Sequence, residues 1–150
     1  MVEKTLVKNP AITIAQMIKL EPKPEPLFLS GDFLETLRPP NAEKSSAVMI
    51  LAHSTKIIRI IPTKSPKVLK VKIEFYNGTL FLRELGIVLN RNNIKTLYST
   101  TICFHDPPCG PYETYIDSGD LQISEDQLKS ELLTIPSIGN VEVTDVDWDF

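Results

Sequence analysis

The clearest periodic pattern in the chain lies in residues 68–75, VLKVKIEF. Apolar side chains there alternate with mostly charged ones, which is the period of two expected of a half-buried β-strand. In residues 80–89 the apolar positions recur at helical spacing instead, and Asn92-Asn93 follows as a stop signal. The two segments predict a strand followed by a helix.

Similar patterning continues to the end of the chain. We expect strands over residues 94–104 and 112–116, and a closing strand over residues 141–146. Ser124 opens the segment SEDQLKSELL, whose acidic first turn and leucine-bearing side favour a helix. The order βαββαβ predicts an α+β fold, a ferredoxin-like sandwich with two helices on one face of a four-stranded antiparallel sheet.

Prolines break the first part of the chain into short elements. The spacing of apolar residues in 11–20 predicts a helix, and a second short helix, capped by Ser30 or Asp32, is expected before two consecutive prolines. Residues 47–61 hold two apolar runs around His53-Ser54, which is the pattern of a β-hairpin. The ferredoxin-like unit therefore carries an N-terminal extension of helix and hairpin.

The regular pattern begins near residue 66, where we place a boundary between a Pro-rich basic extension, residues 1–65, and a domain of residues 66–150. Residues 1–72 carry twelve Lys and Arg against six Asp and Glu, whereas residues 73–150 carry four against thirteen. A basic half can contact nucleic acid, but this one has no Arg cluster, interleaved aromatic residues or Cys/His finger. Solvated strand faces, or contact with the acidic half, is the favoured interpretation.

Several classes of protein are excluded by what the sequence lacks. The apolar runs are too short to cross a bilayer and the first ten residues have no signal-peptide core, so we expect a cytoplasmic protein without membrane contact. The sequence has no Ser/His/Asp set, no GxxxxGK loop and no HExxH motif. We expect a non-catalytic protein without a cofactor, in which His53 is a turn residue.

The segment CFHDPPCG, residues 103–110, holds both cysteines of the chain. The candidate metal ligands are Cys103, His105 and Cys109, with Asp106 as a fourth, but their spacing matches no known zinc module. A disulfide between Cys103 and Cys109 is the second interpretation, because these residues flank a turn between two expected strands. The favoured interpretation is a plain turn shaped by its prolines and its glycine.

The second half of the chain resembles an ACT domain, a small regulatory ligand-binding module, over about residues 66–146. The resemblance rests on the first strand running into a turn with Gly78 and on the helix LFLRELGIVLNRNN leading into the strand NIKTLYS. A second helix ending in IPSIGNVEV completes it. The family resemblance implies a regulatory role for the chain.

The turn at Gly78 has chemistry that suits a ligand. A glycine lets the backbone approach a bound molecule, and N–H groups at the start of a helix favour a carboxylate. Because ACT domains commonly bind their effector between this turn and a partner subunit, the resemblance implies a homodimer or higher homo-oligomer that senses an amino acid or similar small carboxylate. The ligand-binding residues it implies are Tyr76, Asn77, Gly78, Thr79, Leu80, Phe81, Leu97, Tyr98, Ser99 and Thr100.

Other interpretations remain open. The chain could be a metabolite-responsive transcriptional regulator that contacts DNA through residues 1–65. It could also be a structural or regulatory subunit that pairs with an enzyme through a sheet edge. Asn77-Gly78 itself could be no more than a competent turn between a strand and a helix.

Overall fold

Strands and helices follow one another after residue 67 in the order that the sequence pattern predicts. The computed structural model describes residues 29–38, 46–102 and 109–146. The elements of the second half are β3 (Val68–Phe75), α2 (Gly78–Arg91), β4 (Thr96–Thr101), β5 (Cys109–Asp117), the 3-10 turn η1 (Ser118–Asp120), α3 (Glu125–Leu133) and β6 (Ile138–Asp145).

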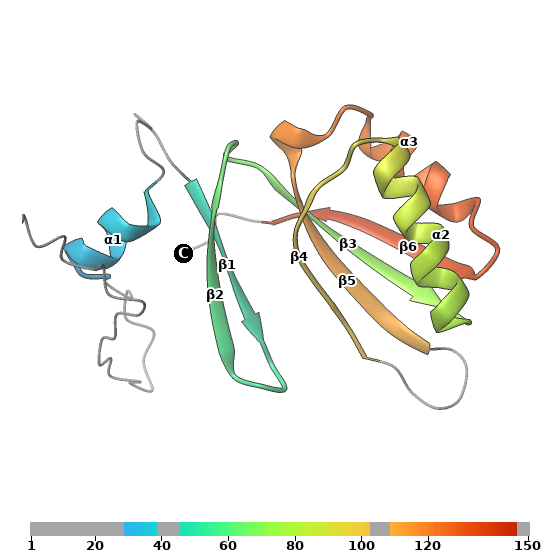
Figure 1. The fold of residues 1–150 in the computed structure, drawn as a ribbon, viewed down its shortest axis with the longest axis horizontal. Helices are drawn as coiled ribbons and strands as arrows, with labels where there is room; N and C mark the ends of the chain where they lie inside the picture. The colour runs from blue at the N-terminus through green and yellow to red at the C-terminus, as the bar shows by residue number, and fades with distance from the viewer. Residues whose placement is uncertain (1–28, 39–45, 103–108, 147–150) are drawn as a thin grey trace, which may run out of the picture.

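Two antiparallel sheets make up the β-structure. The larger has the strand order β4-β5-β3-β6, with each neighbouring pair antiparallel, and α2 and α3 lie over one of its faces (Figure 1). The smaller is a hairpin of β1 (Ser46–Ala52) and β2 (Ile57–Thr63), which follows the short helix α1 (Gly31–Leu37). Across the described residues this is a mixed α+β structure of two sheets and three α-helices, consistent with a ferredoxin-like fold.

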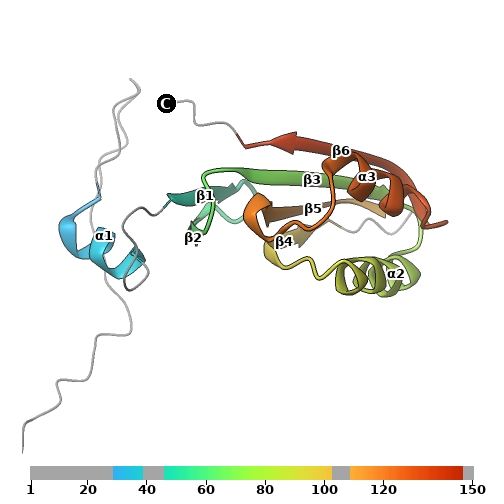
Figure 2. The ribbon, with the colours of Figure 1, turned by 90° about the horizontal axis from the view of Figure 1, so that it is seen from above.

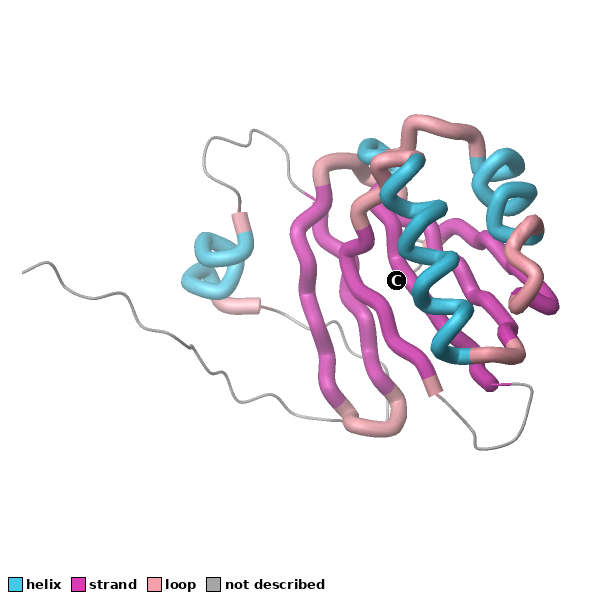
Figure 3. The backbone as a smooth tube through the Cα atoms, turned by 45° about the vertical axis from the view of Figure 1, so that its right-hand side comes forward, coloured by secondary structure: helices cyan, strands magenta, loops and turns pink. Residues whose placement is uncertain are grey.

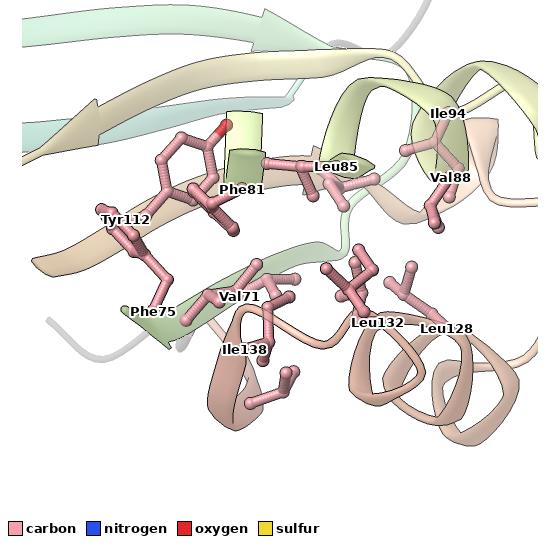
Figure 4. Close-up of a cluster of buried hydrophobic side chains, with 14 residues drawn as sticks. Val71, Phe75, Phe81, Leu85, Val88, Ile94, Tyr112, Leu128, Leu132 and Ile138 are labelled. Carbon is pink, nitrogen blue, oxygen red and sulfur yellow. The ribbon is translucent and has the colours of Figure 1, made fainter. Parts of the chain in front are cut away.

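Aromatic stacking closes the core between the larger sheet and its helices. Phe81 of α2 is fully buried, and its ring stacks on that of Phe75 with the centroids 4.2 Å apart. Tyr112 of β5 meets Phe81 edge-on at 5.4 Å (Figure 4). Leu128 and Leu132 of α3 belong to the same core. Because these side chains bury large apolar areas, they hold both helices on the same face of the sheet.

The ends of the elements differ from expectation at a few places. The hairpin, expected over residues 47–61, extends further, because β2 runs on to Thr63 and Pro62 pairs with Ala47. Proline is tolerated there because, in an edge strand, some backbone N–H groups point away from the neighbouring strand and form no ladder hydrogen bond. β4 begins two residues later than expected, after Asn93 takes a left-handed φ of 52°. The helix expected over residues 11–20 lies outside the described residues.

The predicted start of α3 is confirmed. Ser124 Oγ accepts a hydrogen bond from the Gln127 N–H at 3.1 Å, and Gln127 Oε1 accepts one from the Ser124 N–H at 3.0 Å. This reciprocal capping box satisfies two backbone donors at the helix start. Of the two caps proposed for α1, Ser30 occupies the N-cap position.

Asp117, at the end of β5, forms hydrogen bonds with the linker that connects the two sheets. The residue is only 1% exposed. Its Oδ2 accepts a hydrogen bond from the backbone N–H of Lys64 at 2.5 Å, and its Oδ1 accepts from the Ser65 hydroxyl at 2.5 Å and from the Gly119 N–H at 3.0 Å. Lys64 and Ser65 lie between β2 and β3. The buried carboxylate therefore fixes the hairpin relative to the larger sheet.

The same contacts set the charge of Asp117. Burial by itself raises the pKa of this carboxyl, but the Ser65 hydroxyl and the N–H groups of Lys64 and Gly119 lower it by more, so the net pKa lies below the usual value. A lowered pKa means that the ionised form stabilises the native state. This contribution is complete above the ordinary aspartate pKa of about 3.9 and is lost as the pH falls through the lower native value.

We expect Asp117→Asn to lower the free energy of unfolding by about 2 kcal/mol or more at pH 7, because it leaves buried donors poorly paired. The difference from the wild type should shrink below about pH 4, where the wild-type carboxylate becomes protonated. Urea unfolding at several pH values measures both effects. Asp120→Asn is the matched control: Asp120 pairs with the exposed Lys64 ammonium, and its loss should cost less than about 1 kcal/mol. Equal effects of the two changes would contradict the anchoring role.

The hairpin turn offers a second test of the fold. Lys56 has a φ of 56°, a left-handed conformation that is strained for a residue with a Cβ. Lys56→Gly should therefore raise the free energy of unfolding by about 0.5–1 kcal/mol. Thr55→Gly, one residue earlier and without a positive φ, should lower it, because there glycine only adds freedom to the unfolded chain. Thermal unfolding of both variants measures the sign, and destabilisation by Lys56→Gly would contradict the assigned turn conformation.

Candidate functional site

The β1–β2 hairpin packs on the sheet face that lies opposite the helices. Figures 1 and 2 show the hairpin on one side of the larger sheet and α2 and α3 on the other. Val48 and Ile50 of β1 are buried there in a small apolar cluster with Val68. Tyr98 of β4 and Tyr115 of β5 pack against this cluster from the sheet. The two sheets thus share a second core, smaller than the one beneath the helices.

Cations strengthen the contact between the sheets. Tyr98 and Tyr115 are cross-strand partners with ring centroids 6.4 Å apart. The Arg59 guanidinium of β2 lies 5.2 Å from the centroid of the Tyr98 ring, and the Lys70 ammonium of β3 lies 5.9 Å from that of Tyr115. Both distances are in the range of cation–π attraction. One face of each tyrosine ring is therefore already used by a cation of the protein.

A pocket of about 290 Å³ lies between the tip of the hairpin and the strands β4 and β5. Figure 3 shows the hairpin strands running alongside β4, with their turn near the end of that strand. Residues 50–54 form the hairpin wall of the pocket. The opposite wall comes from residues of the two sheet strands, among them Tyr98, Thr100, Glu113 and Tyr115. The pocket is therefore a space between two sheets, mostly apolar with a few polar groups.

Glu113 gives the pocket a charged group. Its Oε1 lies 3.0 Å from Lys70 Nζ, and both side chains are about one third exposed, at 27% and 34%. Burial lowers the pKa of Lys70, but the hydrogen bond to Glu113 and the charges of Glu113 and Tyr115 raise it by more, so the net pKa lies above its usual value. Glu113 lines the pocket, and its partner Lys70 lies just outside the lining.

The turn predicted to bind a ligand is capped by its own asparagine. Asn77 Oδ1 accepts a hydrogen bond from the Leu80 N–H at 3.2 Å, and the Phe81 N–H donates to the Asn77 carbonyl at 2.8 Å. The N–H groups of Leu80 and Phe81, at the start of the helix, thus have partners within the chain, and the Phe81 side chain lies in the core. In the rest of the turn, Tyr76 and Thr79 are exposed and Gly78 is half-buried.

The four residues of β4 that were predicted to bind a ligand lie in different surroundings. Tyr98 and Thr100 line the pocket, and Leu97 packs against the hairpin cluster. Ser99 instead hydrogen-bonds the Thr114 hydroxyl at 2.8 Å. Because β5 lies between β4 and β3 in the sheet, the structure does not bring the β4 residues and the turn after β3 together. Ligand binding at that turn stays a prediction.

Sequence reasoning missed much of the pocket. Ile50, Glu113 and Tyr115 were not among the predicted site residues, and His53, assigned to a turn, lines the pocket as well. The alternation in YETYID was a usable signal, because it places Glu113 and Tyr115 on one face of their strand. What the sequence did not indicate is that the hairpin lies over that face.

Ion pairs join some of the lysines of the basic half to carboxylates of the acidic half. Lys64, Lys67 and Lys70 of the basic half each lie within 3.2 Å of a carboxylate from the acidic half. This agrees with the interpretation that the two halves contact one another. Exposed pairs of this kind add little stability each, but they leave these three lysines less available to an external phosphate.

The cysteine-rich segment lies largely outside the described residues. This holds for Cys103 and His105, while Cys109 begins β5 without a described side chain, so the metal and disulfide interpretations stay predictions. Across residues 29–38, 46–102 and 109–146, no group of three or more His, Cys, Asp or Glu side chains could hold a metal ion. No helix in the same ranges is long and apolar enough to span a membrane.

Comparison of the sequence with models of protein families and with curated proteins finds no match. Among solved structures, the chain is similar to the solution structure of the C-terminal domain of the MgtC protein from Mycobacterium tuberculosis. The TM-score is 0.43 at 13% sequence identity, and the match covers 55% of this chain and 89% of that domain.

The packing of the hairpin on the sheet predicts that neighbouring residues of β1 contribute differently to stability. Ile50 is 6% exposed in the shared cluster, whereas Met49 is 58% exposed. We expect Ile50→Ala to lower the free energy of unfolding by about 2 kcal/mol or more, and Met49→Ala to change it by less than about 1 kcal/mol. Hydrogen exchange should also speed up in β1 and β2 of the Ile50 variant. Similar costs for both variants would show that the hairpin does not pack as described.

Proposed function

We propose that this chain is a non-catalytic regulatory module of the ACT type that senses an amino acid or a similar small carboxylate. The observation that carries the proposal is the pocket between the hairpin and the larger sheet, at about 290 Å³. That volume is at the lower end of the range for small-molecule sites, which suits a ligand of amino-acid size better than a nucleotide. The resemblance of residues 66–146 to ACT domains supports the regulatory role.

The lining of the pocket also supports binding rather than chemistry. Its charged group, Glu113, is paired with the Lys70 ammonium rather than with a nucleophile. His53 stands on the hairpin wall, and the remaining polar groups of the lining are hydroxyls of Ser, Thr and Tyr. Such groups orient a ligand through hydrogen bonds. The proposal therefore assigns no catalytic residue and no cofactor.

A regulatory module needs a structural response to its ligand. The pocket has one wall on the hairpin and the other on the sheet, so a ligand that contacts both stabilises the packing of the one on the other. The hairpin connects directly to the segment that precedes Ser46. In this proposal the ligand acts on residues 1–45 through the hairpin, and a homodimer, as the family resemblance implies, presents two such sites.

A thermal-shift screen with the twenty amino acids and common small metabolites tests the proposal. A ligand at 100 times its dissociation constant should add about 2.7 kcal/mol to the free energy of unfolding and raise the melting temperature accordingly. Failure of every compound to raise it would refute the sensing role.

Two matched variants locate the site. Ala52→Phe places a ring into the pocket, whereas Ala47→Phe adds the same ring to an exposed position of the same strand. A ligand of the pocket should stabilise the wild type and Ala47→Phe but not Ala52→Phe. If Ala52→Phe responds like the wild type, the ligand binds elsewhere, and the turn at residues 76–81 becomes the site to test.

A further inference from the structure

The charged residue that lines the pocket, Glu113, is paired with a lysine just outside the lining. Glu113 of β5 lines the pocket, and Lys70 of the neighbouring strand β3 contacts it at 3.0 Å. Lys70 lies next to Tyr115, another lining residue, which is its cross-strand partner. A positive group therefore lies within one ion-pair distance of the negative group that lines the pocket.

We propose that Glu113 and Lys70 together recognise a zwitterion, so that the ligand of the pocket is a free amino acid with an apolar side chain. The ligand ammonium binds Glu113 and its carboxylate binds Lys70. This inference rests on the proposed function, since it presupposes that the pocket binds a small molecule. It adds which residues bind the two charged groups of that molecule.

Electrostatics favours a zwitterion over a ligand with one charge. A simple carboxylate in the pocket lies beside Glu113, which repels it, and a simple amine lies beside Lys70. An amino acid offers each group of the pair an opposite charge. Both carboxylate and ammonium form several hydrogen bonds, so the pair can bind the ligand without breaking its own contact.

The tyrosine rings are less suited to bind the ammonium. Arg59 already lies over Tyr98 and Lys70 over Tyr115, at 5.2 and 5.9 Å from the ring centroids. A carboxylate attracts an ammonium more strongly than a neutral ring that already faces a cation. Glu113 is therefore the acceptor expected for the ligand ammonium.

The rest of the pocket determines the side chain of the ligand. Away from the ion pair the lining includes Ile50, Ala52, Ile102 and Pro111, which have no charged group. Burial of a charged ligand side chain against them would cost free energy without a partner, whereas an apolar one gains it. Amino acids such as leucine, valine, methionine and phenylalanine fit this chemistry.

Isothermal titration of the full chain with matched ligands tests the proposal. The probes are L-leucine, 3-methylbutylamine, which lacks the carboxylate, and 4-methylpentanoate, which lacks the ammonium; valine, methionine and phenylalanine are tested with their corresponding amines and acids. We expect the amino acid to bind at least about tenfold more tightly than either single-charge analogue, the usual effect of one charged hydrogen bond. An amine or acid that binds as tightly as its parent amino acid would overturn the inference.

Charge-removing variants separate the two contacts. Glu113→Gln should weaken the amino acid and the amine at least about tenfold but leave the acid unaffected or tighter, and Lys70→Met should do the reverse. Glu142→Gln and Lys67→Met remove the same charges outside the pocket and should leave every affinity unchanged. This crossed pattern distinguishes recognition from a general loss of structure, and the comparison of ligands on the wild-type chain needs no variant to fold.

The outcomes also separate this inference from the proposed function. If a ligand found in the thermal-shift screen loses binding in Ala52→Phe but keeps its affinity in Glu113→Gln and Lys70→Met, the zwitterion inference is wrong and the sensing role stands. The same conclusion follows if the screen finds pocket ligands but no amino acid among them. If no compound binds, both proposals fail.

Discussion

The placement of the hairpin depends on the buried carboxylate of Asp117. Only four residues separate β2 from β3, and two of them, Lys64 and Ser65, donate hydrogen bonds to this one side chain. A short linker held at a buried acceptor leaves the hairpin few orientations. In the orientation observed, Val48 and Ile50 face Tyr98 and Tyr115. A single polar group therefore positions a contact that is otherwise apolar.

The same sheet face explains why a pocket persists between the two sheets. Beyond Val68, the side of β3 that faces away from the helices carries Lys70, Lys72 and Glu74. Charged side chains cannot be buried in a dry interface without partners, so the hairpin packs closely only where the face is apolar or aromatic. Near Lys70 and Glu113 the ions pair with one another and stay partly exposed. The pocket lies beside Glu113.

The sequence predicted those features that depend on local pattern. β3 has both of its expected ends, Val68 and Phe75, because strict alternation is visible within the segment. The cap at Ser124 was found for the same reason. The pocket depends instead on residues 50–54 meeting residues 98–115, a contact distant in sequence. Since residues 47–52 are apolar throughout, their pattern did not reveal which side of the hairpin is buried.

The turn after β3 shows a different case, in which the sequence pattern located the turn but did not determine its chemistry. Asn77 was correctly placed between strand and helix, and its side chain accepts a hydrogen bond from the Leu80 N–H at the start of the helix. Capping residues compete with ligands for the same backbone donors. Sequence alone predicts the turn and does not decide between these two uses of it.

The two walls of the pocket come from segments on either side of residue 66. A fragment that begins near residue 66 contains the whole four-stranded sheet and both of its helices, and so keeps the larger core. It lacks residues 50–54, and with them one entire wall, while Tyr98 and Tyr115 become exposed to solvent. Such a fragment would report on the stability of the larger sheet and its helices but would lack the pocket, because the pocket forms only where the hairpin and the sheet are part of the same molecule.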